Sequence, residues 1–277
     1  MKPILVVDDD TTVLGLLADV LRDAGYAIDT AQDGIDALEK LRTGSYDLML
    51  LDVWMPRMNG LELLAKLHEH PVRPKVIIMT ADNTPETLLS TIREQAYQYM
   101  PKPFEPQALK EMVTRVLAAP AEAAPIEVIS ARPDWVELLV PCELEVVERI
   151  QNFLMHLKAD LPSEVRESVG RAFHELLLNA VEWGGELDPN RKVRIAFLRA
   201  RRMLLYRIAD PGRGFKLEAL PHAALNNPPG APFEHVKVRE AKGLRAGGFG
   251  ILLARTMVDE LIYNEACNEV VFVKYLD

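Results

Sequence analysis

Five short strand-like runs, each followed by a segment of helical periodicity, fill the first 119 residues of the chain. The runs lie at residues 4–7, 27–31, 48–51, 76–79 and 97–100, and the helical segments lie at 11–24, 34–41, 61–68, 85–96 and 109–117. Strict alternation of this kind predicts a parallel sheet with helices on both faces, because a crossover helix must join each pair of parallel strands. We therefore expect residues 1–119 to form an α/β domain built on a doubly wound, five-stranded parallel sheet.

Polar side chains follow four of these runs. Asp8 and Asp9 follow the first run, Asp52 the third, Thr80 the fourth and Lys102 the fifth. The carboxyl ends of parallel strands meet at one edge of a sheet, so these side chains are expected to converge there. Carboxylates that converge repel each other unless a divalent cation such as Mg²⁺ neutralises them. Lys102 and Thr80 could then bind a phosphoryl group carried by one carboxylate.

Several motifs of the first half point to one family. In chain order they read VVDDD, LLDVWMP, MNG, MTAD and YMPKPF. Together they resemble the receiver domain of bacterial response regulators, which has a flavodoxin-like fold. The resemblance implies that Asp52 accepts a phosphoryl group from an upstream sensor histidine kinase.

The same resemblance assigns roles around Asp52. It implies that Asp9, Asp52 and the backbone carbonyl of Trp54 bind Mg²⁺, while Asp8 holds a metal-bound water. It also implies that Thr80 and Lys102 contact the phosphoryl group and that Tyr99 is an aromatic switch. The Lys102-Pro103 peptide bond is expected to be cis, as is common in this family.

An Ala/Pro stretch, AAPAEAAP at residues 118–125, separates the two halves of the chain. Such a composition offers little to bury and is typical of a semi-stiff linker, although the last helix could also continue as far as Pro120. We expect a linker over residues 120–133 and a second domain over residues 134–277. Its predicted strands lie at 135–140, 193–198, 203–209 and 270–275, and its helices at 144–157, 163–185 and 251–258.

The helix that ends in RAFHELLLNAVEWGG, residues 171–185, places Glu175 and Asn179 one turn apart on one side. A carboxamide oxygen can bind Mg²⁺ while a carboxylate orients or deprotonates an attacking hydroxyl group, so the pair suits a metal-phosphate site. Taken alone, the pair also fits the ordinary polar border of an amphipathic helix. His174 adjoins Glu175 in sequence but is expected to point elsewhere on the helix.

Two glycine-containing segments follow. Asp210 ends a predicted strand and opens DPGRGF, in which Gly212 and Gly214 keep the backbone open beside it. The aspartate could accept a hydrogen bond from the amino group of adenine. The second segment, Gly247-Gly248-Phe249-Gly250, precedes a helix, where glycines let the backbone approach phosphates.

In this order the three segments resemble the N box and the two glycine boxes of the GHKL ATPase superfamily, and most of all the anti-sigma-factor serine/threonine kinases. The strands and helices predicted in this half indicate an α/β sandwich with helices layered on one face of a mixed sheet. The resemblance assigns general-base catalysis to Glu175, Mg²⁺ binding to Asn179 and adenine recognition to Asp210. ATP is the implied nucleotide, held by Gly212, Gly214, Gly247, Gly248 and Gly250, and residues 215–245 would form a lid over it.

Composition narrows the class of protein further. The net charge of −9 argues against a general nucleic-acid binder, and no apolar run approaches the roughly 20 residues that span a bilayer. Cys142 and Cys267 lack the spacing of a metal site or disulfide framework, which fits a reducing cytoplasm. A histidine kinase is disfavoured, because His156 lacks an acidic neighbour and only one suitable helix precedes the Asn179 segment.

The sequence therefore predicts a cytoplasmic response regulator whose phosphorylation at Asp52 controls an ATP-dependent serine/threonine kinase. Its expected partners are a sensor histidine kinase and an anti-sigma antagonist of the STAS-like kind, a sigma factor, or both. The family resemblance also makes a homodimer plausible. The alternative is a module that binds ATP and switches partners without transferring phosphate.

Overall fold

The computed structural model describes residues 2–69, 73–82, 84–120, 125–157, 160–216, 237 and 249–276. The chain divides into two compact units, Met1–Ala123 and Ala124–Asp277. Among the described residues, no helix has both the length and the apolar character that crossing a bilayer requires.

The first unit is built on a five-stranded sheet in the order β2-β1-β3-β4-β5, in which every neighbouring pair is parallel. The strands are β1 (Pro3–Val7), β2 (Ala27–Ala31), β3 (Leu48–Asp52), β4 (Lys75–Thr80) and β5 (Gln98–Pro101). Its helices are α1 (Thr11–Asp23), α2 (Gly34–Thr43), α3 (Gly60–Lys66) with the 3₁₀ turn η1 (Leu67–Glu69), α4 (Pro85–Arg93) and α5 (Pro106–Ala118). The predicted doubly wound α/β fold is confirmed.

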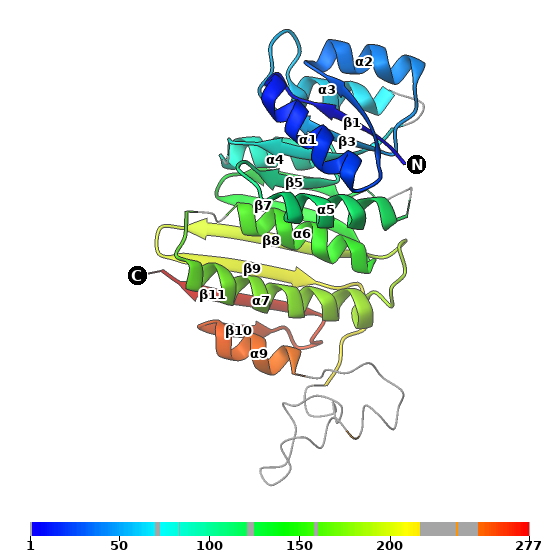
Figure 1. The fold of residues 1–277 in the computed structure, drawn as a ribbon. Helices are drawn as coiled ribbons and strands as arrows, with labels where there is room; N and C mark the ends of the chain where they lie inside the picture. The colour runs from blue at the N-terminus through cyan, green and yellow to red at the C-terminus, as the bar shows by residue number, and fades with distance from the viewer. Residues whose placement is uncertain are drawn as a thin grey trace. The chain divides into compact units, whose positions relative to one another are not determined.

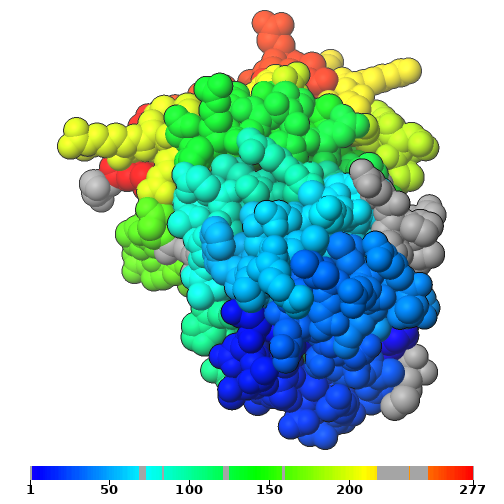
Figure 2. Space-filling view, turned by 90° about the horizontal axis from the view of Figure 1, so that it is seen from above, coloured from blue at the N-terminus to red at the C-terminus, as the bar shows by residue number. Residues whose placement is uncertain are grey.

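The predicted site of this unit lies at the carboxyl edge of the sheet, where buried strands end and capped helices begin. All five residues of β3 are buried, as expected of a central strand covered on both faces. Asp10 caps α1 by accepting hydrogen bonds from the backbone amides of Thr12 and Val13. The helix therefore begins at Thr11, only two residues after Asp9. A capping box between Asn59 and Glu62 starts α3 in the same way after the loop that follows β3. Figure 2 shows one outer face of this unit, coloured from blue onward.

The second unit is built on a six-stranded sheet in the order β10-β11-β9-β8-β7-β6. The strands are β6 (Glu127–Arg132), β7 (Trp135–Pro141), β8 (Lys192–Ala200), β9 (Met203–Ala209), β10 (Glu260–Tyr263) and β11 (Glu269–Tyr275). The helices α6 (Leu144–His156), α7 (Ser163–Asn179) and α9 (Gly250–Met257) lie together on one face of it (Figure 1). This is the predicted α/β sandwich, but the prediction of a mixed sheet is wrong, because every described strand pair is antiparallel.

A cluster of aromatic rings fastens α7 to this sheet. Tyr206 of β9 is fully buried and stacks on Phe272 of β11 with ring centroids 4.7 Å apart. The ring centroid of Tyr206 also lies 4.9 Å from that of Phe197 of β8 and 5.5 Å from that of Phe173 of α7. Aromatic pairs at these distances add to the stabilisation from burial alone. The helix that carries Glu175 and Asn179 is thereby held against β9, which ends at Ala209, just before Asp210.

Two strands were not anticipated. β6 lies within the range expected to be linker, so the prediction of a linker over residues 120–133 is wrong from Glu127 onward. It forms a hairpin with β7 whose register shifts between Val128 and Ser130. The four-residue strand β10 was also missed.

Candidate functional site

In the first unit, three of the predicted side chains meet at the carboxyl edge of the sheet. The ammonium nitrogen of Lys102 lies 2.6 Å from Asp8 Oδ2 and 2.7 Å from Asp52 Oδ1. Asp8 and Asp52 are both buried, at 1% and 6% exposure. Burial raises the pKa of Asp52, against the opposing hydrogen bond and charge of Lys102. Burial lowers the pKa of Lys102, but its hydrogen bonds to the two carboxylates outweigh this and raise it overall.

This edge of the sheet fits a magnesium ion. Mg²⁺ is usually bound in proteins by one or two carboxylates together with waters and phosphate oxygens. Asp8 and Asp52 supply two convergent carboxylates, whereas Asp9 is exposed. The described residues contain no group of three or more His, Cys, Asp or Glu side chains placed to hold a metal ion. Asp8 and Asp52 are thus the carboxylates that the structure brings together here, and the metal-bound water expected at Asp8 and the roles of Asp9 and the Trp54 carbonyl stay predictions.

A chain of hydrogen bonds leads away from Asp52. The backbone amide of Trp54 donates to Asp52 Oδ2 at 2.9 Å, and its indole nitrogen donates to Asp82 Oδ2 at 3.1 Å. The backbone amide of Asp82 donates to the hydroxyl oxygen of the fully buried Thr80 at 3.1 Å. The hydroxyl group of Tyr99 donates to the Asp82 carbonyl at 3.2 Å. The sequence placed Thr80 and Tyr99 at this site but gave no role to Asp82 or to the Trp54 indole.

The backbone around Asp52 is closely packed. A Cβ atom at Gly60 would lie 2.1 Å from the carbonyl oxygen of Asp52, so only glycine fits there. The Lys102-Pro103 peptide bond is cis, as expected.

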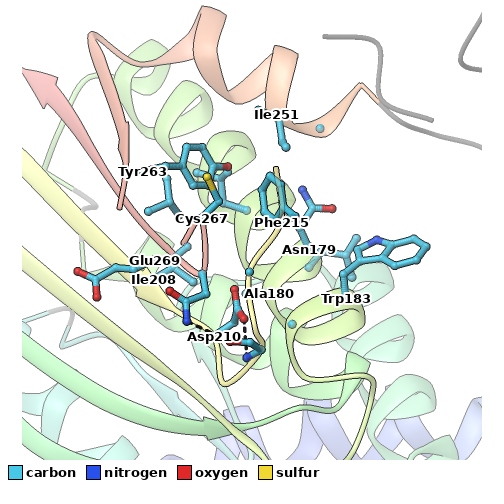
Figure 3. A pocket seen from close by; sticks show the side chains of 18 of the residues that line it. Asn179, Ala180, Trp183, Ile208, Asp210, Phe215, Ile251, Tyr263, Cys267 and Glu269 are labelled. Atoms are coloured by element: carbon cyan, nitrogen blue, oxygen red, sulfur yellow. Dashed lines mark hydrogen bonds between the residues drawn. The ribbon is translucent and has the colours of Figure 1, made fainter. Parts of the chain in front are cut away.

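In the second unit, the predicted residues line one cavity of about 1000 Å³. Figure 3 shows Asn179, Asp210, Phe215 and Tyr263 around its interior, with Ile251 of α9 on one side. The predicted residues that line it are Glu175, Asn179, Asp210, Gly212, Gly214 and Gly250. Gly247, Gly248 and most of the expected lid lie outside the described residues.

The start of α9 lies directly against the side of α7 that carries Glu175 and Asn179. A Cβ atom built on Gly250 would lie 2.6 Å from Glu175 Oε2 and 3.4 Å from Asn179 Nδ2. Glycine at this position therefore lets the helix approach both predicted functional side chains. Amide groups at a helix N-terminus favour anions, so a phosphate beside Gly250 would also be near Glu175 and Asn179.

Two glycines, Gly184 and Gly212, lie directly against the half-buried side chain of Asp210. Its Oδ1 accepts a hydrogen bond from the Gly212 amide at 2.8 Å, and burial raises its pKa. A Cβ atom at Gly184 would lie 2.2 Å from Asp210 Cγ, and one at Gly212 would lie 2.7 Å from Asp210 Oδ1. Oδ2 accepts no hydrogen bond from the residues that the structure describes. This half-buried acceptor, in a cradle that a Cβ atom would fill, fits the amino group of a purine base.

A π-helical turn, η2 (Ala180–Gly184), extends α7 and brings Gly184 against Asp210. The Gly185 amide donates to the Ala180 carbonyl at 2.8 Å, the five-residue spacing of a π-helix. Such turns occur frequently at functional sites. Trp183 of this turn lines the cavity while half exposed. The sequence predicted continuous α-helix here and gave no sign of the π-turn.

His174 also lines the cavity. His156 lies half-buried on α6, where burial lowers its pKa and Nδ1 lies 2.8 Å from the Asn152 carbonyl. Tyr263 and Phe215, which make an edge-to-face contact at 5.8 Å, complete an aromatic wall that the sequence did not reveal.

Comparison with known proteins matches each of the two units to a family model. Residues 4–114 match the family model of the response regulator receiver domain, and residues 140–274 match that of the histidine kinase-like ATPase domain. The alkaline phosphatase synthesis transcriptional regulatory protein PhoP of Bacillus subtilis is 35% identical over 124 residues, covering 45% of this chain and 52% of the relative. The DNA-binding transcriptional regulator NtrC of Escherichia coli is 37% identical over 114 residues, covering 41% of this chain and 24% of the relative.

A solved structure, the response regulator protein TrrA from Thermotoga maritima in complex with Mg²⁺ and BeF, shares 40% identity. It covers 42% of this chain and 99% of its own length at a TM-score of 0.39. The chain thus spans about half or less of the two curated relatives, and these likenesses concern the first unit. Two family models thus divide the chain between a response regulator receiver domain over residues 4–114 and a histidine kinase-like ATPase domain over residues 140–274.

Proposed function

We propose that this chain is a two-component response regulator whose second unit is an ATP-dependent serine/threonine protein kinase controlled by phosphorylation of Asp52. The observation that carries the proposal is the single cavity that gathers Glu175, Asn179 and Asp210. A carboxylate, a carboxamide and a half-buried aspartate are the groups needed to take a proton, bind Mg²⁺ and recognise adenine.

In this proposal each side chain has one task. Asp210 accepts a hydrogen bond from the adenine amino group, and Asn179 holds Mg²⁺ through its amide oxygen. Glu175 takes the proton from the hydroxyl group that is to be phosphorylated. ATP is the second substrate: the hydroxyl oxygen bonds to its γ-phosphorus, the bond to the bridging oxygen breaks, and ADP leaves. The protein substrate would be an anti-sigma antagonist of the STAS-like kind, and a sigma factor would be an additional or alternative partner.

The first unit would supply the control. A sensor histidine kinase would donate a phosphoryl group to Asp52, with Lys102 and Thr80 as its contacts and Asp8 and Asp52 holding Mg²⁺. The added charge would rearrange the series of hydrogen bonds that runs from Asp52 through Trp54 to Asp82. This rearrangement would change the activity of the second unit.

Titration calorimetry of Mg-ATP binding on the full chain tests the nucleotide site and its control together. Wild type and Asn179→Ala are each measured with and without beryllofluoride, which mimics a phosphoryl group on Asp52. We expect wild type to bind, Asn179→Ala to bind at least about tenfold more weakly, and beryllofluoride to change the wild-type affinity. A wild type that binds no ATP in either state would refute the kinase proposal.

A second candidate function is an ATP-binding module that switches partners without phosphate transfer. Its support is the close approach of Glu175 Oε2 to Gly250, which suits a carboxylate that holds α9. Glu175→Ala separates the two functions. If ATP binding persists while transfer of labelled phosphate to the partner is lost, together with the output, Glu175 acts in catalysis. An unchanged output in that variant would favour the switching module.

A further inference from the structure

The hairpin turn between β10 and β11 lies directly against the loop that carries Asp210. The Asp210 amide donates to the Asn268 carbonyl at 2.9 Å, and the Phe215 amide donates to the Ala266 carbonyl at 3.0 Å. Between these two points the side-chain nitrogen of Asn268 donates to the Gly212 carbonyl at 3.0 Å. Three hydrogen bonds therefore fasten residues 210–215 to one turn.

The packing between the loop and the turn is close. Gly214 has a φ of +77°, and a Cβ atom there would lie 1.7 Å from the Ala266 carbonyl oxygen. No other residue type could keep this backbone in place, because the position combines a left-handed conformation with direct backbone contact. The loop is thus shaped by the turn beneath it.

The turn is itself held rigid by a second asparagine. Asn264 Oδ1 accepts hydrogen bonds from the backbone amides of Asn268 and Glu269 at 3.1 and 3.2 Å, and Asn264 Nδ2 donates to Asn268 Oδ1 at 2.8 Å. The Cys267 amide also donates to the Asn264 carbonyl at 3.0 Å, and Cys267 has a φ of +57°.

These contacts fix the orientation of both amide groups. Gly212 offers a carbonyl, so the Asn268 atom that meets it must be the nitrogen, and Asn268 Oδ1 is then the acceptor for Asn264. Both polar atoms of each side chain are occupied. Asn268 also lines the cavity, next to Asp210.

We infer that Asn268, braced by Asn264, is a positioning residue that gives the cavity its preference for adenine. The inference rests on the proposed nucleotide site. The Gly212 amide holds Asp210 Oδ1, and Asn268 holds the carbonyl of that same Gly212. Losing the Asn268 donor frees the Gly212 peptide to rotate, so Asp210 no longer points at a fixed place. Contacts with the phosphates do not depend on this peptide.

The test compares Mg-ATP with Mg-ITP, in which a carbonyl replaces the amino group of adenine. Titration calorimetry gives the ratio of the two affinities for the full-length wild type, Asn268→Asp and Asn264→Ala. Asn268→Asp keeps the size and one acceptor but removes the donor to Gly212, and Asn264→Ala removes the brace. We expect wild type to favour ATP and each variant to reduce this preference by about tenfold. The double variant should lose little more than either single one, because both act through one turn.

Asn190→Asp is the matched control. Asn190 also donates from its side chain, to Asp188 Oδ1 at 3.1 Å, but it lies in an exposed turn and does not line the cavity. It should keep the wild-type preference for ATP over ITP.

The outcomes separate the inference from the proposed function. If wild type favours ATP and both turn variants keep that preference, Asn268 is only structural and the inference is wrong, even if their melting temperatures fall. If wild type binds neither nucleotide, the proposed nucleotide site fails and the inference fails with it. If Asn268→Asp does not fold, the ratio measured for Asn264→Ala decides.

Discussion

At the scale of single residues, Asp52 illustrates how function opposes stability. Its carboxyl group is buried, and burial raises its pKa in the folded chain above the value of about 3.8 that it has when unfolded. The contribution of this group to the free energy of unfolding is therefore fully present only at a pH below its pKa in the unfolded chain. That contribution is lost as pH rises through the raised pKa, so at pH 7 the ionised side chain costs stability.

Asp52→Asn should therefore raise the melting temperature of the first unit at pH 7 by a few degrees. The difference from wild type should shrink as the pH falls below 7, because the wild-type carboxyl group becomes protonated on the way down. Thermal unfolding followed by calorimetry across this pH range checks both points. Asp19→Asn, at a side chain that is 81% exposed, should have no such effect. A lower melting temperature for Asp52→Asn at pH 7 would contradict the assignment of burial as the dominant influence.

At the scale of elements, the π-turn η2 and the loop after β9 interlock through glycines. Gly184→Ala would place a Cβ atom 2.2 Å from Asp210 Cγ, so the aspartate or the turn must move. We expect this variant to bind Mg-ATP at least about tenfold more weakly, as measured by calorimetry. Gly15→Ala is the control, because nothing lies within 4 Å of its added Cβ atom on α1, where alanine favours the helix by up to about 1 kcal/mol. Undiminished ATP binding by Gly184→Ala would mean that Asp210 does not recognise the nucleotide.

Helices and strands whose apolar residues recur at regular spacing could be predicted from the sequence. The five strands and the helices of the first unit followed from alternation alone, and the meeting of Asp8, Asp52 and Lys102 followed from the geometry of parallel strands. In the second unit, helical spacing placed Glu175 and Asn179 on one face, which the structure places in one cavity with Asp210.

The missed elements lack such a local signal. β6 is an irregular edge strand whose residues are mostly exposed or half-buried, and β10 has only four residues. The π-turn consists of residues that are compatible with a continued α-helix. Asn268 and Gly212 are 56 residues apart, so their hydrogen bond leaves no trace in either neighbourhood of the sequence.

At the scale of the whole molecule, the two units should unfold separately and respond to different ligands. Each unit has its own sheet and its own hydrophobic core. Differential scanning calorimetry of the full chain should show two transitions. Beryllofluoride with Mg²⁺ should raise one of them and Mg-ATP the other, by about 2.7 kcal/mol of stabilisation when the ligand is at 100 times its dissociation constant.

Variants assign the transitions. Asp52→Asn should abolish the response to beryllofluoride, and Asn179→Ala should abolish the response to ATP. A single transition raised by either ligand would instead mean that the units fold as one cooperative body.

The five-residue turn at Ala180–Gly184 also sets how this cavity would respond to a change in chain length. A π-turn holds one residue more than an α-turn, so the segment is equivalent to a one-residue insertion in an α-helix. Deleting one residue within the turn would leave Glu175 and Asn179 in the same places, because they precede it. The residues after the deletion would be rotated by about 100° around the helix axis. The contact between Gly184 and Asp210 therefore depends on the extra residue, whereas the positions of Glu175 and Asn179 do not.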